Sequence, residues 1–94
     1  SLRWNQTGVV VAGTGNSGSA LNQFDRPNCI HIDDRDSMYI CDHQNYCVKR
    51  WLPNATSGIP VTNPNNNDHV MHLAIDKNGS FYVSDHGEDH VLRY

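Results

Sequence analysis

Two stretches of the chain decide the fold, IHIDDRDSMYICD at residues 30–42 and LAIDKNGSFYVSD at residues 73–85. In each stretch, apolar residues alternate with polar ones on both sides of a short polar segment. Such alternation is typical of strands with one buried face, and a segment rich in Asp, Asn and Gly is typical of a tight turn. Each stretch therefore predicts two antiparallel strands joined as a hairpin.

The two hairpins belong to an internal repeat. Asp42 and Asp85, which end them, are 43 positions apart. A further strand is predicted after each hairpin, at Val48–Trp51 and at Val91–Tyr94. Leu2–Trp4, at the start of the chain, resembles the end of this strand. We expect fourth strands at residues 8–12 and 58–61. Four short antiparallel strands in a period of this length describe one blade of a β-propeller.

The chain is thus predicted to be all-β and to hold about two blades. Residues 1–12 supply the last two strands of a first blade, residues 27–61 a complete blade, and residues 69–94 three strands of another. Because about four to eight blades close a propeller, we expect other copies, or the rest of a longer chain, to complete it. Ser1 begins the chain without a Met or a leader, so we expect a processed or excised segment.

Composition excludes several classes of function. The 94 residues carry 7 Lys and Arg against 10 Asp and Glu, a net charge of −3, whereas nucleic-acid and anionic-membrane binders need the opposite balance. No apolar run approaches the roughly 18 residues of a membrane span. We therefore expect neither nucleic acid nor membrane insertion.

The repeat resembles that of the NHL-repeat β-propeller family. The residues that carry the resemblance are Pro27, Ile30–Asp33, Met38–Asp42, Asn45 and Val48–Trp51. The second copy departs from it, with Glu88 in place of Asn45 and no Pro at the expected place before Leu73. The resemblance implies a binding platform without catalytic activity. Its enzyme alternative is a fragment of a zinc-dependent propeller similar to peptidyl-amidating lyase.

Three cysteines leave at least one thiol unpaired. Cys41 ends one predicted strand and Cys47 begins the next, so a Cys41–Cys47 disulfide across the turn is our prediction. Cys29 is an alternative partner for Cys41, and three free or buried thiols are a further alternative.

Three N-x-S/T sequons lie in polar turns, at Asn5, Asn54 and Asn78. They predict glycosylation and therefore a secreted, extracellular protein.

The six histidines invite a metal interpretation, because His43 and His86 follow Asp42 and Asp85 at equivalent positions. However, no His-x-His or His-Glu-x-x-His spacing is present, so we predict no metal and no cofactor. We expect Asp42 and Asp85 themselves to be structural, accepting hydrogen bonds from backbone N–H groups of the turn that follows each of them.

Aromatic residues recur at one position of the repeat, at Trp4, Trp51 and Tyr94. We expect these rings to pack between blades, with sugar stacking as the alternative.

The predicted function is that of a non-enzymatic extracellular module for binding or structural assembly, whose expected partners are other copies of itself, with protein or glycan ligands as a further class. The last blade lacks a fourth strand, which the N-terminal strand of another copy can supply. The residues expected at this head-to-tail contact are Val9, Val10, Val11, Val91, Arg93 and Tyr94. Such a contact closes into a ring or continues as a filament.

Overall fold

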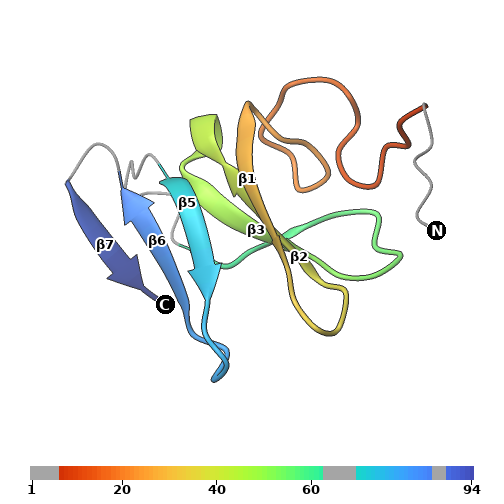
Figure 1. Ribbon diagram of the computed structural model, residues 1–94. Helices are drawn as coiled ribbons and strands as arrows, with labels where there is room; N and C mark the ends of the chain where they lie inside the picture. The colour runs from red at the N-terminus through yellow and green to blue at the C-terminus, as the bar shows by residue number, and fades with distance from the viewer. Residues whose placement is uncertain (1–6, 63–69, 86–88) are drawn as a thin grey trace.

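The computed structural model describes residues 7–62, 70–85 and 89–94. The described chain contains strands and one short 3₁₀ turn, so the prediction of an all-β protein is confirmed. The elements are β1 (Pro27–Ile32), β2 (Met38–Asp42), η1 (His43–Asn45), β3 (Cys47–Trp51), β4 (Ile59–Pro60), β5 (Val70–Ile75), β6 (Phe81–Asp85) and β7 (His90–Arg93). They form two antiparallel sheets, β1-β2-β3-β4 and β5-β6-β7, each in sequence order (Figure 1).

The two sheets repeat each other residue by residue. In the first sheet, Ile30 pairs with Ile40, which in turn pairs with Lys49. In the second sheet, the corresponding row is Leu73, Val83 and Leu92, each 43 positions later. Even the irregularities coincide, because the register shifts between Pro27 and Cys29 and again between Val70 and His72. The sequence repeat is therefore a structural repeat.

The hairpin turns repeat in the same way. The Asp33 Oδ1 atom accepts hydrogen bonds from the N–H groups of Arg35 and Ser37, both at 2.9 Å. The Asp76 Oδ1 atom accepts from the equivalent N–H groups of Asn78 (2.9 Å) and Ser80 (3.0 Å). An aspartate that binds the backbone two and four residues ahead fixes the turn locally, which explains why each hairpin forms where the sequence places it.

Each sheet has two faces, which we name the A face and the B face. The same letter is given to faces that carry equivalent residues of the repeat. Directly paired residues lie on the same face, and neighbours along a strand alternate. The A face of the first sheet carries Cys29, His31, Tyr39, Cys41, Val48 and Arg50, and that of the second sheet carries their equivalents His72, Ala74, Tyr82, Ser84, Val91 and Arg93. The B face of the first sheet carries Ile30, Ile32, Met38, Ile40, Lys49 and Trp51, and that of the second sheet carries Leu73, Ile75, Phe81, Val83, Leu92 and Tyr94.

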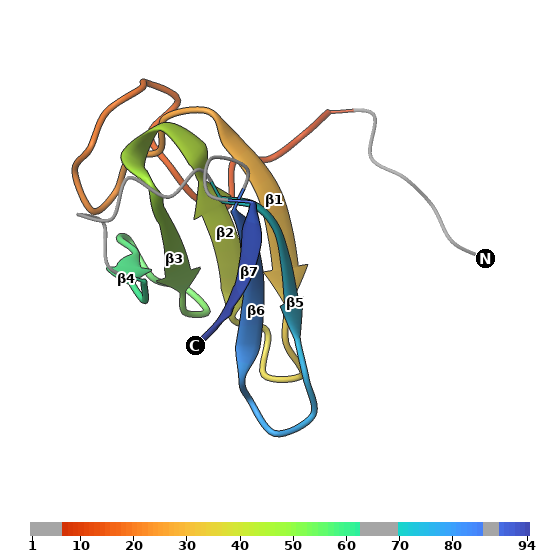
Figure 2. The ribbon, with the colours of Figure 1, turned by 90° about the vertical axis from the view of Figure 1, so that its left-hand side faces the viewer.

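The core lies where the B face of the second sheet packs on the A face of the first. Cys41 and Val48 of the A face and Val83 of the B face are fully buried and form one cluster. Beside them, the rings of Tyr39 and Phe81 lie 5.9 Å apart. In Figures 1 and 2, β5 runs alongside β1 at this contact. Unlike faces therefore meet, which is the arrangement of successive units in a repeat stack.

The strand expected at residues 8–12 is not formed in the single chain. Residues 8–11 are irregular and exposed, and they lie on the segment that extends away from the sheets toward the N-terminus (Figure 2). A strand needs a neighbour for its backbone groups, and none of the described strands pairs with residues 8–11. The expectation for residues 1–6 lies outside the described residues.

Candidate functional site

Asp42, at the end of β2, is fully buried and is held by three groups. The Asp25 N–H donates to Oδ1 at 2.7 Å, the Asn45 side-chain amide donates to Oδ2 at 2.8 Å, and the Lys49 ammonium lies 3.0 Å from Oδ2. A buried carboxylate needs such partners because its lost hydration must be replaced. The Asp42 side chain therefore has a structural role. Its backbone partner is Asp25, which precedes β1.

Lys49 fastens the segment 18–25 to the B face of the first sheet. Its ammonium donates to the carbonyl oxygens of Ala20 (3.0 Å) and Gln23 (2.6 Å) and lies 5.3 Å from the centre of the Phe24 ring. Phe24 in turn packs 5.7 Å from Trp51, whose side chain is 4% exposed. Segment 18–25 thus covers the β3 side of the B face, and Trp51 is a packing residue.

A groove of about 680 Å³ lies between the two hairpin turns. Its walls carry acidic and basic groups together, among them Asp33, Asp76, Arg35, Arg50 and Lys77. A mixed lining of this kind gives no single sign of charge to attract an ionic ligand.

The two turn aspartates in this groove stay ionised. Partial desolvation raises the pKa of Asp33, but the N–H groups of Ser37 and Arg35 and the charge of Arg50 outweigh it and hold the pKa below its ordinary value. For Asp76, desolvation is outweighed by the Tyr82 hydroxyl, which donates at 3.0 Å, and by the turn N–H groups, so that its pKa is lowered too. Carboxylates of lowered pKa are weak proton acceptors at neutral pH, which suits turn stabilisation and not acid–base catalysis.

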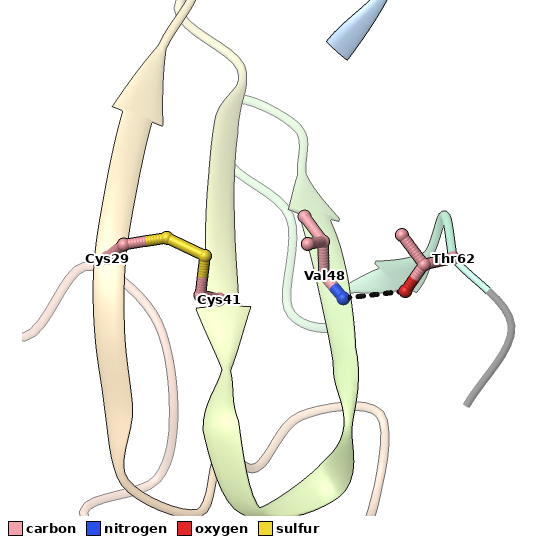
Figure 3. The surroundings of a disulfide bond; sticks show 4 residues. All are labelled: Cys29, Cys41, Val48 and Thr62. Atoms are coloured by element: carbon pink, nitrogen blue, oxygen red, sulfur yellow. Dashed lines mark hydrogen bonds between the residues drawn. A yellow bond between two sulfur atoms is a disulfide. The ribbon is translucent and has the colours of Figure 1, made fainter. Parts of the chain in front are cut away.

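The predicted Cys41–Cys47 disulfide is wrong: Cys41 is bonded to Cys29 (Figure 3). Cys29 and Cys41 are paired across β1 and β2, with their Cα atoms 5.0 Å apart. Cys47 pairs with Asp42, one residue beyond Cys41, so it lies on the B face while Cys41 lies on the A face. Thiols on opposite faces of a sheet cannot meet, whereas directly paired cysteines satisfy the required separation.

Cys47 is a buried free thiol. Desolvation and the nearby charge of Asp42 raise its pKa to about 11. Because the thiolate is the nucleophilic form, a thiol with so high a pKa is inert at neutral pH. Cys47 is therefore a packing residue of the B face.

The structure describes some of the remaining predicted site residues. Asn54 and Asn78 are exposed in turns, where a glycan has room, and Asn5 lies outside the described residues. His43 is half-buried, and His86 is not described. Within residues 7–62, 70–85 and 89–94, no three metal-binding side chains cluster, and no helix is long and apolar enough to cross a bilayer. Glycosylation and the expected lack of a metal or cofactor stay predictions.

The residues predicted for self-association are surface residues at two separate places. Val9, Val10 and Val11 are exposed on one side of the molecule, and Val91, Arg93 and Tyr94 are exposed at β7 on the other side (Figure 1). One chain therefore does not bring the two groups together. In the described part of the chain β7 has β6 as its only neighbouring strand, whereas the equivalent strand β3 also pairs with β4.

Sequence reasoning missed two features of this surface. It did not foresee that Lys49 is buried beneath segment 18–25, because no local pattern links residues so far apart. It also did not foresee that unlike faces of the repeat pack on each other. The signal for the second feature is in the sequence, since the apolar rows of β1–β2 and β5–β6 are equivalent. Neither the comparison with protein-family models nor that with curated proteins found a match.

Proposed function

We propose that the chain is a pair of NHL-type β-propeller blades and acts as a non-enzymatic extracellular module for binding or structural assembly. The observation that carries this proposal is the packing of the B face of one repeat on the A face of the other. Repeating one such step places each sheet against the next around an axis, which is how propeller blades follow one another. The strand order of each sheet and the period of the repeat agree with blades of this type.

Head-to-tail association is part of this proposal, and the arrangement of the two sheets supports it. The second sheet ends at β7, at the place where β4 extends the first sheet. The exposed valine segment, residues 8–11, precedes β1 as residues 59–60 precede β5, so in a neighbouring copy it has the connectivity of a missing fourth strand. Addition of a strand to a sheet edge supplies backbone hydrogen bonds, and β6 is the only described strand that pairs with β7. The contact joins unlike surfaces and so forms a ring or a filament.

An extracellular location is supported by two observations. The Cys29–Cys41 disulfide is of a kind that persists in oxidising compartments. The sequons at Asn54 and Asn78 lie in exposed turns. Intact-mass measurement of the protein secreted from eukaryotic cells should show a loss of mass after amidase treatment. An unchanged mass contradicts the glycosylated form of the proposal.

Sedimentation velocity tests the assembly. We expect species that are multiples of the 10.6 kDa chain, growing with concentration. Val10→Pro removes one backbone donor from the added strand and should abolish these species. Val10→Thr is the matched control, because it keeps the donor and the branched side chain, and it should still assemble. A folded monomer at all concentrations, or assembly that Val10→Pro leaves unchanged, contradicts strand addition.

A further inference from the structure

We infer that the contact between the two sheets of one chain is repeated between chains: the A face of the second sheet docks on the B face of the first sheet in another copy. This inference rests on the proposed self-association and adds a second, separate surface to it. Strand addition uses backbone groups at the edge of β7, whereas this contact uses side chains on the broad faces of the sheets.

The free A face carries apolar side chains that the repeat elsewhere buries. Val48, on the A face of the first sheet, has no exposed surface, whereas its equivalent Val91 is 66% exposed. Tyr39 is covered by Phe81, and its equivalent Tyr82 lies on the free face, next to the exposed Ala74. The two A faces differ in exposure because the second sheet covers the A face of the first sheet, whereas no described segment covers the A face of the second sheet.

The free B face shows the complementary difference. Ile30 and Ile32 are each 57% exposed, although their equivalents Leu73 and Ile75 are half-buried in the contact between the sheets. Ile30 lies with Met38 and Ile40 in an apolar groove of about 390 Å³, which Val11 also lines. Apolar surface of this kind gains free energy when it leaves water.

The part of the first sheet's B face that segment 18–25 leaves uncovered is the part on which a neighbouring sheet would pack. Segment 18–25 covers the β3 side, where Phe24 packs on Trp51. The β1 side is left open, and within the chain it is the corresponding strand, β5, that packs against β1 and β2. The covering segment therefore leaves room for a neighbouring sheet in the same orientation.

The occupant is a second copy of this chain, because the internal contact gives a complete set of partners for it. In the repeat, Tyr82 is the equivalent of Tyr39 and Met38 is the equivalent of Phe81. The Tyr39–Phe81 contact therefore corresponds to Tyr82 of one copy packed on Met38 of the next. Leu73 packs against the cluster of Cys41, Val48 and Val83. Its equivalent is the exposed Ile30, which is therefore placed beside Val91 of the other copy. The connectivity is also consistent, since the segment before β1 pairs with β7 of the previous copy and then leads into the docking sheet. Both contacts join the same two copies.

Cysteine crosslinking tests this pairing directly. In a Cys47→Ala background, Met38→Cys and Tyr82→Cys are prepared as separate proteins, mixed, and treated with a short bismaleimide. We expect a covalent dimer in the mixture and none with either variant alone, because the contact is between unlike faces. Lys77→Cys is the control for Tyr82→Cys, because Lys77 is exposed in a hairpin turn outside both faces, and it should give no dimer with Met38→Cys.

A second pair of variants guards against a failure of the crosslinker. Ile30→Lys with Ile32→Lys places two charges in the docking face, and it should weaken association on the order of a hundredfold in sedimentation experiments. The chain itself should fold, because both side chains are mostly exposed in the monomer. Leu52→Lys, at an exposed apolar residue outside both faces, should associate like the unmodified protein.

The outcomes separate the two claims. A protein that is monomeric at all concentrations overturns both the proposed self-association and this contact. Assembly that persists unchanged in the double lysine variant, with no mixed crosslink, overturns the face contact alone and leaves strand addition standing. A mixed crosslink together with the hundredfold loss establishes the face contact.

Discussion

The buried ion pair between Asp42 and Lys49 offers the sharpest test of the packing. Their side chains are 0% and 3% exposed, so neither charge is hydrated. Lys49→Met removes the cation and leaves the Asp42 carboxylate buried without its charged partner, at a cost of about 3–5 kcal/mol. It also removes two hydrogen bonds to the carbonyl oxygens of Ala20 and Gln23. We expect a fall of about 4 kcal/mol in the free energy of unfolding.

Such a loss is large for this chain, because small domains have total stabilities of about 5–15 kcal/mol. In urea, with an m-value of about 1–2 kcal/mol/M, the midpoint should fall by about 2–4 M. The measurement is far-UV circular dichroism at one low protein concentration, so that association does not add to the apparent stability.

Two further variants identify the cause. Asp42→Asn with Lys49→Met leaves an uncharged side chain of the same shape, and it should recover more than half of the loss. Lys77→Met removes an exposed lysine and should change the stability by less than about 0.5 kcal/mol. A loss below about 1 kcal/mol in Lys49→Met refutes the reasoning, because it means that Asp42 does not depend on this cation.

Three other predictions concern the cysteines and the turns. Non-reducing peptide mapping should find Cys29 joined to Cys41, and reduction of this bond should cost about 2–4 kcal/mol of stability. The Cys47 thiol, with its pKa raised from 9.0 to about 11, stays protonated in the folded protein while the unfolded chain ionises. Stability is therefore full below about pH 9 and should fall by about 2 kcal/mol by pH 11, and urea titrations of a Cys47→Ala variant should lack this part of the loss. Asp33→Ala removes the acceptor of two turn hydrogen bonds and should cost about 1–2 kcal/mol, whereas Asp33→Asn, which keeps an acceptor oxygen, should cost less.

The hairpins could be predicted from the sequence because their causes are local. Asp33 and Asp76 bind N–H groups within four residues, and the alternation of apolar residues on each side sets which face is buried. The repeat added the expectation that the two sheets are alike in structure, since equivalent sequences form equivalent structures. Strand order and the all-β class needed no further information.

The disulfide was predicted wrongly because nearness in sequence is a poor guide to a sheet face. The choice between Cys29 and Cys47 as partner of Cys41 depends on register, and a shift of one residue moves a side chain to the other face. The turn after β2 places Asp42 opposite Cys47, so Cys41 faces Val48 instead.

Two other features depend on contacts that are distant in the sequence. Lys49 lies among apolar strand residues, and its burial is explained only when the carbonyl groups of Ala20 and Gln23 are placed above it. The valines at residues 9–11 have strand propensity, but a strand also needs a paired sheet edge, and none of the described strands pairs with them.

The most direct test of the account is an experimental structure of the assembled 94-residue protein. We expect residues 8–12 of one copy to lie as a fourth strand beside β7 of another, and the A face bearing Tyr82 to pack on the B face bearing Met38. An assembly in which like faces meet about a two-fold axis, or in which residues 8–12 stay unpaired, contradicts the account.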